Sequence, residues 1–484
     1  MPLRTDTQYK QGLKDDRNVY ILGNKVNDVT QDPFIKVGVE TAAFDFILGH
    51  DPAYKDISVM SSPFDQSEIS SYFDVPDYPD AVEKRFNLVK TASHYTDAAL
   101  PFVKDVGTDI MNGLLAVSQL MGNKTYVDRI NDYRWYCAKN DLSIAGAVTD
   151  VKGDRSKSPS EQDSPDYYLR VIDETDSEII VSGAKAHITA SPYVDEIIVI
   201  PTRNMTEAES DYAIAFAIPA NTKGITHVCR PNFRYEDRYH FPTPRPKRGH
   251  LEALVIFDNV RVPKSRVFML REWQFSQAIA YAFSAFHRFT AVTYKIPILE
   301  HMTGLGMLVA EANGIEKASH VRERFIDMIR YTEITKSLAK AAIASPENFY
   351  NSGYFVANRL QSNMAKLYFA SNFHEFIRCI QDLAGGLLVT QPTYKDWQHE
   401  ALNPYFQKYL GGAGAYSAEN RMKLMSYLHH VAASDFAGWH EVCTIHAEGS
   451  FAAQKMMLYA EAPMDMYKEQ ARKIVGLPSD NTSL

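Results

Sequence analysis

Residues 146–168, GAVTDVKGDRSKSPSEQDSPDYY, form the longest polar, irregular stretch of the 484-residue chain. Before it, from about residue 35 to 140, apolar residues recur with the period of a helix. After it, from about 146 to 270, short runs rich in β-branched and aromatic residues alternate with Pro and Gly. The polar stretch therefore marks the point at which a helical layer gives way to a β domain.

The β region is followed by helical patterns that continue to the end of the chain, at 276–311, 317–344, 354–384 and 418–446. Elements segregated in this way indicate an α+β fold, and no GxGxxG follows a strand, which argues against a dinucleotide-binding Rossmann unit. We expect an N-terminal helical domain at 1–145, a central antiparallel β-barrel or sandwich at 146–272 and a C-terminal helix bundle at 273–484. Six strands are expected, in YYLRVID, EIIVSGAKAHIT, DEIIVIPT, DYAIAFAIP, GITHVCR and LEALVIFDNVRV.

Composition narrows the functional class. Hydrophobic residues make up 45% and charged residues 23% of the chain, as in an ordinary globular protein. The net charge of −8 makes nucleic acid an unexpected partner. Four cysteines without a CxxC pair favour a reducing compartment. With no signal-like N-terminus and no run of about 18 apolar residues, we expect a cytoplasmic protein that does not enter a membrane.

Two polar segments are candidate ligand sites. In TDVKGDR, 149–155, a glycine that permits a tight turn can aim backbone N–H groups and two cations at one anion, for which a pyrophosphate is the natural candidate. In GAKAHIT, 183–189, His187 and Thr189 offer hydrogen-bond donors at the end of a strand. The alternatives are a surface linker for the first segment and a strand end with polar residues for the second.

A third candidate is the helix end at Ala384, Gly385 and Gly386, where two glycines permit close approach of a flat ligand but also make a common C-cap. A fourth lies in AFSAFHRFTAVTYKIP, 282–297, an apolar helix that carries His287, Arg288 and Tyr294. A lone histidine on such a helix is often a packed core residue. The neighbouring cations and Pro297 favour an active-site role for His287 instead.

Together, GAVTDVKGDR, VSGAKAHIT, EALVIFDNVRVP, NGIEKASHV and DLAGGLLVTQP resemble the family of 4-hydroxyphenylacetate 3-hydroxylase, which also contains 4-hydroxybutyryl-CoA dehydratase. The resemblance runs from near residue 15 to about 460. It implies an acyl-CoA dehydrogenase-like architecture with a four-helix bundle, assembly as a dimer or tetramer, and non-covalent FAD between the β domain and the bundle. It places flavin contacts at Val148, Thr149, Asp154, Arg155, His187, Thr189, Ala384, Gly385 and Gly386, and contacts to a neighbouring subunit's flavin at Asn313 and Glu316.

Within the family, the dehydratase holds an iron–sulfur cluster by three cysteines and a histidine. His287 matches the histidine, but His94, Asp105 and Tyr294 stand at or near the three cysteine positions, after KTAS at 90–93 and an apparent insertion. Because such clusters need thiolate ligands, we expect no iron–sulfur cluster and no other metal site. We also expect Cys443 to replace the dehydratase's catalytic glutamate near the HxxGS stretch.

The hydroxylases hold their phenol with an arginine, a tyrosine and a histidine, for which this chain has only Lys104, Thr108 and Gly146 nearby. The leading expectation is nevertheless an FADH2-dependent monooxygenase, the oxygenase component of a two-component system with a separate flavin reductase and a homotetrameric form. It would hydroxylate a phenolic or other electron-rich aromatic molecule with O2 through a C4a-hydroperoxyflavin, with His287, Arg288 and Tyr294 as catalytic residues. The alternatives are a cluster-free FAD enzyme that isomerises or eliminates on an acyl-CoA thioester, and a flavin-binding scaffold without turnover.

Overall fold

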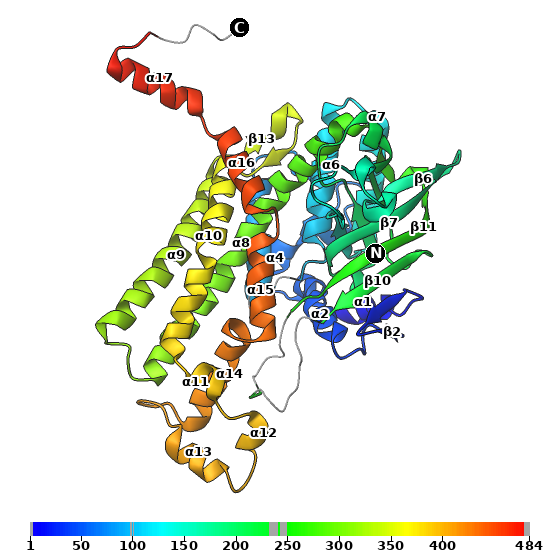
Figure 1. Cartoon of the computed structure of the whole chain (residues 1–484). Helices are drawn as coiled ribbons and strands as arrows, with labels where there is room; N and C mark the ends of the chain where they lie inside the picture. The colour runs from blue at the N-terminus through cyan, green and yellow to red at the C-terminus, as the bar shows by residue number, and fades with distance from the viewer. Residues whose placement is uncertain (1–2, 97–98, 100, 232–240, 243–248, 479–484) are drawn as a thin grey trace.

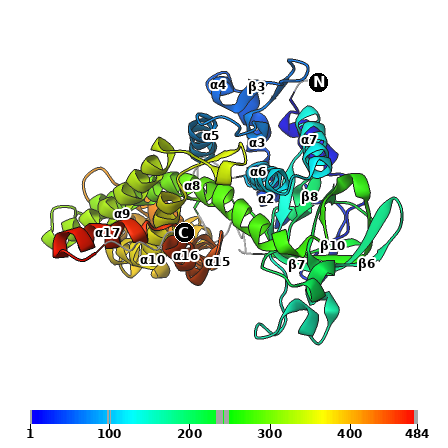
Figure 2. The same ribbon diagram turned by 90° about the horizontal axis from the view of Figure 1, so that it is seen from above.

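Two β-sheets lie beside a bundle of long helices in the computed structural model of the chain (Figure 1). The structure describes residues 3–96, 99, 101–231, 241–242 and 249–478. Seen from above, α6 and α8 lie between the sheets on one side and α9 and α10 on the other (Figure 2). Short segments at the N-terminus cover this junction: α1 (Asp6–Gly12), α2 (Ile35–Ala42), α3 (Phe44–Ile47), α4 (Lys55–Ser58), β3 (Val59–Ser61) and β4 (Glu68–Ser70).

The larger sheet has six strands in the order β2-β1-β10-β11-β7-β6, and the smaller has four in the order β12-β9-β8-β5. Their inner faces share one apolar core, in which Phe216 of β9 packs edge-on against Phe257 of β11 at 6.3 Å between ring centroids. The strands are β1 (Val19–Ile21), β2 (Asn24–Val26), β5 (Ile144–Ala147), β6 (Arg170–Glu174), β7 (Glu178–Thr189), β8 (Glu196–Val199), β9 (Ile214–Pro219), β10 (Ile225–Arg230), β11 (Glu252–Pro263) and β12 (Val267–Leu270).

All six strands expected from the sequence are present, but the antiparallel barrel is not. Within the described residues neither sheet closes on itself, so the unit is a sandwich, and two strand pairs, β1–β10 and β5–β8, run parallel. The N-terminal 145 residues are not purely helical, because β1 and β2 extend the larger sheet and β5 begins at Ile144. Strands of three or four residues are too short to give a periodic signal.

The N-terminal helical layer consists of α5 (Ala81–Tyr95), α6 (Asp105–Leu120) and α7 (Lys124–Lys139). Helix α6 lies inside the region from about 35 to 140 that was expected to be helical, and almost all of its side chains are buried. At Gly113, a Cβ atom would lie 2.8 Å from the backbone nitrogen of Phe283. This glycine lets α6 approach α8 closely enough for side chains of the two helices to meet in the site described below.

The C-terminal bundle is built on α8 (Ser276–Ala312), α9 (Ser319–Ala344) and α10 (Arg359–Ala384). A fourth column along α10 is divided among α14 (Ala418–Ala432), α15 (Asp435–His446) and α16 (Phe451–Glu461), and α17 (Met464–Val475) projects beyond it (Figure 1). The remaining elements are β13 (Glu347–Asn348), β14 (Phe355–Val356), α11 (Leu387–Thr390), α12 (Tyr394–Trp397) and α13 (Asn403–Tyr409). Among the described helices, none combines the length and apolar character needed to cross a membrane.

Candidate active site

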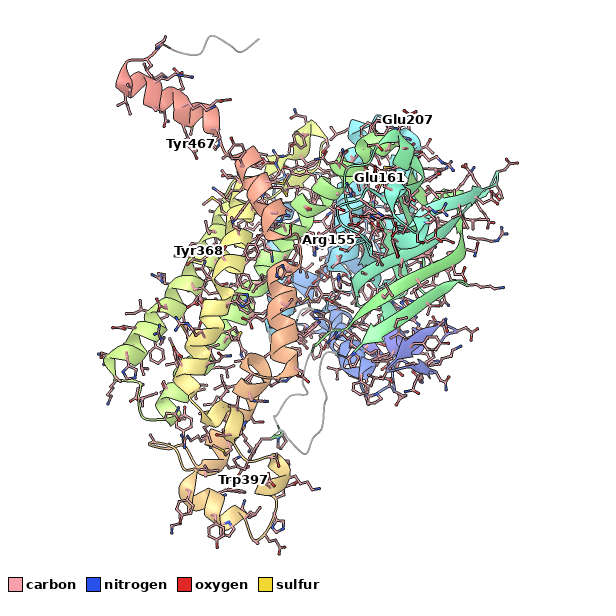
Figure 3. The ribbon with its side chains drawn as sticks, viewed as in Figure 1. Arg155, Glu161, Glu207, Tyr368, Trp397 and Tyr467 are labelled. Atoms are coloured by element: carbon pink, nitrogen blue, oxygen red, sulfur yellow. The ribbon has the colours of Figure 1, made fainter. Side chains whose placement is uncertain are left out.

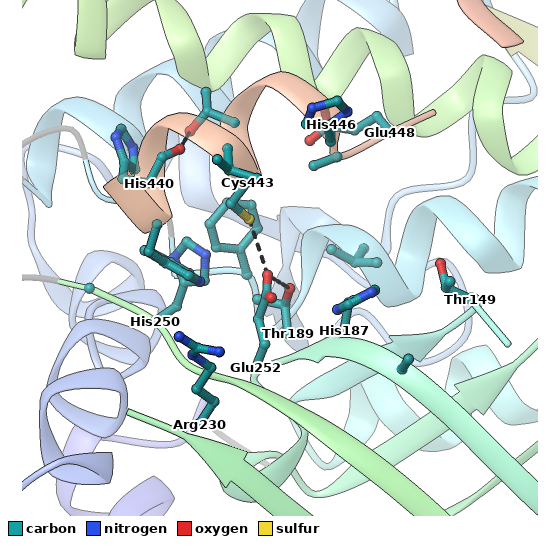
Figure 4. Close-up of a pocket in the computed structure, with 18 of the residues that line it drawn as sticks. Thr149, His187, Thr189, Arg230, His250, Glu252, His440, Cys443, His446 and Glu448 are labelled. Atoms are coloured by element: carbon teal, nitrogen blue, oxygen red, sulfur yellow. Dashed lines mark hydrogen bonds between the residues drawn. The ribbon is translucent and has the colours of Figure 1, made fainter. Parts of the chain in front are cut away.

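A cavity of about 2380 Å³ lies where the polar loop, the ends of β7 and β11, helix α8 and helix α15 meet (Figure 4). Single small-molecule sites typically occupy about 300–1,000 Å³, so this cavity can hold a large cofactor and a substrate together. Of the residues predicted for the site, it brings together eight: Val148, Thr149, Arg155, His187, Thr189, His287, Arg288 and Tyr294.

The start of the polar loop is fixed to the sheet by a buried ion pair. Lys185 Nζ lies 2.8 Å from Asp150 Oδ1 and donates to the carbonyl oxygens of Val148 (2.9 Å) and Ile200 (3.1 Å). Asp150 in turn accepts the Leu169 backbone N–H. These contacts hold Val148 and Thr149 in the cavity wall although no regular strand contains them.

The turn that follows has the tight geometry expected of a glycine. Lys152 and Gly153 both have positive φ, at 75° and 52°, and a Cβ atom at Gly153 would lie 2.4 Å from the ring of Tyr167. Lys152 and Arg155 line the cavity, and Figure 3 shows Arg155 at the boundary between the sheets and the bundle. Burial and the charge of Arg155 lower the pKa of Lys152. The turn thus presents two mutually repelling cations to the cavity, which an anion would relieve.

Asp154 is not in the cavity wall. Its Oδ1 accepts the Ser156 backbone N–H at 2.9 Å and the Ser156 hydroxyl at 2.7 Å, and its carbonyl oxygen accepts from Gln162. This residue therefore shapes the loop itself, and nothing in its contacts directs it toward a ligand.

At the end of β7, His187 is exposed to the cavity and has a positive φ of 58°. Thr189 donates its hydroxyl to Glu252 Oε1 at 3.4 Å, and the same oxygen accepts the Cys443 thiol at 3.1 Å. Figure 4 shows these side chains facing one another across the cavity wall, from β7, β11 and α15. A left-handed conformation at a histidine is strained and is common at functional positions.

His287 is held by a carboxylate on the facing helix. Its Nδ1 lies 3.0 Å from Asp109 Oδ2, and Arg85 Nη2 donates to Asp109 Oδ1 at 2.8 Å. The His287 ring stacks on Phe283 with centroids 5.0 Å apart. A carboxylate that fixes one imidazole nitrogen leaves the other available for proton transfer, so the arrangement of His287 suits a base in the cavity wall.

A second carboxyl group near this pair has no partner. Both carboxyl oxygens of Asp105 are buried without a hydrogen bond to any described residue. Burial raises its pKa to about 6, opposed by the charge of His287 and reinforced by that of Asp109. Asp105 is thus a carboxyl that gives up its proton near pH 6.

Glu448 contributes a buried carboxylate to the cavity wall. It accepts the Tyr294 hydroxyl at 2.9 Å, and Lys295 and Lys366 each place Nζ 2.9 Å from its Oε2. Burial alone would raise the pKa of Glu448, but the two lysine charges outweigh it and hold that pKa well below its usual range. Burial lowers the pKa of Lys295 to about 7. Arg288 serves the same segment, because its Nε and Nη2 donate to the Glu448 carbonyl oxygen at 3.1 and 2.9 Å.

The expectation that Cys443 takes the place of a catalytic glutamate near this segment remains a prediction. Cys443 lines the cavity, but the HxxGS stretch itself, His446–Ser450, delivers Glu448 to the site. The turn after α15 therefore contributes an acidic group, Glu448, to the cavity. The backbone at Glu448 has a φ of 61°, which directs its side chain inward.

The remaining flavin residues expected from the resemblance lie elsewhere. Asn313 and Glu316, together with Ala384, Gly385 and Gly386, are at the far end of the bundle and do not line the cavity. They do lie close to one another, because Asn313 Nδ2 donates to the Leu383 carbonyl oxygen at 3.3 Å. We call these residues, Asn313–Glu316 and Ala384–Gly386, the bundle tip.

The positions at which the dehydratase would carry cysteines do not converge on one ligand set here. His94 pairs with Glu300 at 3.3 Å, whereas Tyr294 is bound to Glu448. The apparent insertion after His94 falls partly on residues 97, 98 and 100, outside the described residues. Of the phenol-contacting positions, Lys104 is committed to Asp141 at 2.6 Å, and a Cβ at Gly146 would lie 2.6 Å from Ile110.

Sequence reasoning missed Asp109, Glu448, Glu252, Lys366 and Arg85 as site residues. Each is an ordinary polar residue in its own segment. Four of them meet because α5, α6, α10 and the turn after α15 pack around α8, and Glu252 enters from the start of β11. The unusual presence of charged residues in almost wholly buried segments was the one available signal, as for Asp105 and Asp109 in α6.

A β-sandwich set against a bundle of long helices, with a cavity between them, defines an acyl-CoA dehydrogenase-like fold. A glutaryl-coenzyme A dehydrogenase structure shares this fold at a TM-score of 0.50 and 12% identity, covering 94% of this chain and 98% of that one. The chain itself belongs to the 4-hydroxyphenylacetate 3-hydroxylase family: residues 5–269 match the model of the N-terminal part and residues 276–476 that of the C-terminal part.

Relatives from two activities span the whole chain. A 4-hydroxybutyryl-CoA dehydratase/vinylacetyl-CoA-Δ-isomerase from Clostridium aminobutyricum is 29% identical over 98% of this chain and 100% of its own. The oxygenase component of 4-hydroxyphenylacetate 3-monooxygenase from Thermus thermophilus is 27% identical, covering 97% and 96%. Among solved structures, an oxygenase component complexed with FAD and 4-hydroxyphenylacetate superposes with a TM-score of 0.88 at 25% identity, covering 98% of each chain.

Proposed function

We propose that this protein is the oxygenase component of a two-component flavin monooxygenase that uses reduced FAD and O2 to hydroxylate a phenolic or similarly electron-rich aromatic molecule. The observation that carries the proposal is the His287–Asp109 pair, an oriented base in the wall of a cavity large enough for cofactor and substrate together. Hydroxylation at a ring carbon is favoured when the phenol has lost its proton, which is the task such a base performs.

The residues around the cavity fit a flavin dinucleotide. The cations Lys152 and Arg155 flank a turn that only glycine can make, as a pyrophosphate requires. Thr189 offers a hydroxyl, and His187 an imidazole, along the adjoining strand. Reduced flavin would supply the activated oxygen, and a separate reductase would supply the reduced flavin.

The protein's own residues then have three tasks. The Lys152–Arg155 turn binds and orients the diphosphate. His287 Nε2 takes the proton of the substrate hydroxyl, while Asp109 keeps the ring in the tautomer that makes this nitrogen the acceptor. The wall formed by Phe283, Tyr294 and neighbouring residues excludes water from the reacting centre.

A second candidate is chemistry on an acyl-CoA thioester without a cluster, isomerisation or elimination. The cavity volume and the 29% identical dehydratase favour it. The Glu448 carboxylate is engaged by Tyr294, Lys295 and Lys366, whereas the His287–Asp109 pair presents a base suited to a phenol. The monooxygenase is therefore the better supported of the two.

Product analysis with labelled oxygen separates these candidates. The full-length protein is mixed with chemically reduced FAD, ¹⁸O₂ and a panel of phenols, and in parallel with acyl-CoA thioesters without oxygen. We expect a hydroxylated phenol that contains one ¹⁸O atom. Turnover of a thioester in the anaerobic arm, with no labelled phenol, would favour the second candidate, and no turnover in either arm would leave a flavin-binding scaffold.

A further inference from the structure

Three side chains of different chemistry converge in the cavity wall beside Thr189. His250 and Glu252 come from the start of β11, and Cys443 comes from α15, almost 200 residues later in the chain. One potential ligand atom from each of the three lies within 4.8 Å of the others. Figure 4 shows the three side chains pointing toward one another from opposite sides of the cavity.

These three donors suit a divalent cation that is intermediate between hard and soft, such as Zn²⁺. Zinc in proteins is held by thiolate sulfur, imidazole nitrogen and carboxylate oxygen, and sites that act on ligands have three protein donors and one open position. A cysteine, a histidine and a glutamate supply one donor of each kind. Because all three residues line the cavity, the fourth position of a tetrahedral ion would open into it.

The surroundings support these donors in the way that metal sites require. Thr189 donates to Glu252 Oε1 at 3.4 Å, an outer contact that orients the carboxylate. The His250 ring is held edge-on between Phe102 and Trp439, with centroids 4.6 Å away on each side. A thiolate and a carboxylate together carry two negative charges, which a divalent ion neutralises.

We propose that His250, Glu252 and Cys443 form a binding site for Zn²⁺, with its fourth position facing the cavity. The contact between Cys443 Sγ and Glu252 Oε1, at 3.1 Å, is the metal-free state of this site, in which the thiol proton occupies the place of the cation. On binding, the S–H bond is broken, an S–Zn bond forms, and the proton leaves to solvent, so that one proton is released for each ion bound. No metal site was expected from the sequence, because no short spacing contains all three donors.

Cobalt substitution tests the site directly. The full-length reduced protein, freed of metal by a chelator, is titrated with Co²⁺, which reports thiolate ligation by a charge-transfer band in the near ultraviolet and tetrahedral geometry by bands in the visible. We expect one equivalent of Co²⁺ per chain, displacement by Zn²⁺ and release of about one proton per ion. The charge-transfer band should vanish in Cys443→Ser, and the affinity should fall by more than the 10–100-fold that loss of an outer-shell partner costs.

The matched control is Cys379→Ser, which removes a cysteine on α10 outside the cavity and should leave the titration unchanged. His250→Gln provides a second variant that tests a different donor if Cys443→Ser folds poorly; it should retain the charge-transfer band with weakened affinity. Binding of less than about 0.2 equivalents of Co²⁺ per chain is the level of an adventitious ion only, and it would overturn the proposal. So would a spectrum that is the same in Cys443→Ser as in the unaltered protein.

Discussion

The cavity and the bundle tip both contain residues that the family resemblance assigns to flavin, yet they are built in opposite ways. The cavity is enclosed and holds buried charges that satisfy one another, such as Glu448 with Lys295 and Lys366. The bundle tip is open: Gly314, Gly385 and Gly386 are exposed, and Glu316 is half-buried without a hydrogen bond to any other described residue. The cavity is therefore enclosed by a single chain, whereas the bundle tip remains open to solvent.

Removing the base should separate catalysis from cofactor binding in the cavity, and this is the largest effect we expect. In His287→Ala, loss of proton transfer should lower the hydroxylation rate by about 10²–10⁴-fold, while FAD affinity changes little because the ring does not reach the Lys152–Arg155 turn. Single-turnover product formation with excess reduced FAD measures the rate, and fluorescence titration measures the affinity. Asp109→Asn should shift the pH–rate profile and retain part of the hydroxylation rate. Equal hydroxylation rates in both variants and in the unaltered protein would show that His287 is not the base.

Replacing Glu448 tests whether the buried charges of the cavity wall stabilise the fold. Glu448→Ala leaves Lys295 and Lys366 buried without their carboxylate, which should reduce the free energy of unfolding by about 3–5 kcal/mol. Urea unfolding monitored by tryptophan fluorescence measures the loss. Asp128→Asn, which breaks an exposed pair with Lys124, is the control and should change stability by at most about 0.5 kcal/mol. A similar, small change in both variants would show that the network is not structural.

Asp105, beside the His287–Asp109 pair, should make the stability of the fold depend on pH. Its pKa of about 6 in the folded protein lies above the ordinary value of 3.8, so the folded state binds the proton more tightly. Stability should therefore fall as pH rises from about 4 to 6, by up to about 3 kcal/mol, and stay lower above that window. In Asp105→Asn this fall should be absent. The difference between the unfolding midpoints of the two proteins, measured from pH 4.5 to 8, should grow with pH; a constant difference would contradict the buried, unpaired carboxyl.

Replacing Arg155 probes the part of the cavity assigned to the pyrophosphate. Arg155→Ala removes a cation and its fork of donors, which should weaken binding of reduced FAD by about 1.5–3 kcal/mol. Equilibrium titration under anaerobic conditions gives the affinity. Arg261→Ala, on β11 but outside the cavity, is the control and should bind FAD normally. Unchanged affinity in Arg155→Ala would move the diphosphate away from this turn.

How far the sequence predicts this molecule depends on whether a feature is local. The six expected strands and the three long helices follow from periodicity, and the turn at Gly153 follows from what only glycine permits, so these could be read along the chain. The near-complete burial of helix α6 could not, because it depends on close packing against α8. The parallel strands β1 and β5 could not either, since their pairing partners lie far away in sequence.

The same division holds for the candidate site. His287 was singled out by its unusual place on an apolar helix, and the structure adds the reason for that place, Asp109, which no spacing connects to it. Glu448 was missed although it lies in the HxxGS stretch, because its lysine partners on α8 and α10 are remote in the chain. Buried ionic networks are properties of packing, and packing joins segments that are remote in the chain.

The smallest effect we expect concerns the bundle tip. It tests whether the tip of one chain contacts the flavin bound by another chain. We predict that the protein is an oligomer in which Glu316 reaches a neighbour's flavin. Because Glu316 has no partner among the described residues of its own chain, Glu316→Gln should leave stability unchanged and weaken FAD binding by only about 0.5–1.5 kcal/mol, the net value of one hydrogen bond.

Co-expressing this variant with Arg155→Ala then distinguishes the two regions, because some sites in the mixed oligomer combine an intact loop from one chain with an intact tip from the other. Those sites should recover normal FAD affinity, whereas no such recovery is possible if loop and tip act within one chain. Sedimentation that finds a monomer with full FAD affinity, or mixed oligomers that show only the two weakened affinities, would show that the tip takes no part in flavin binding.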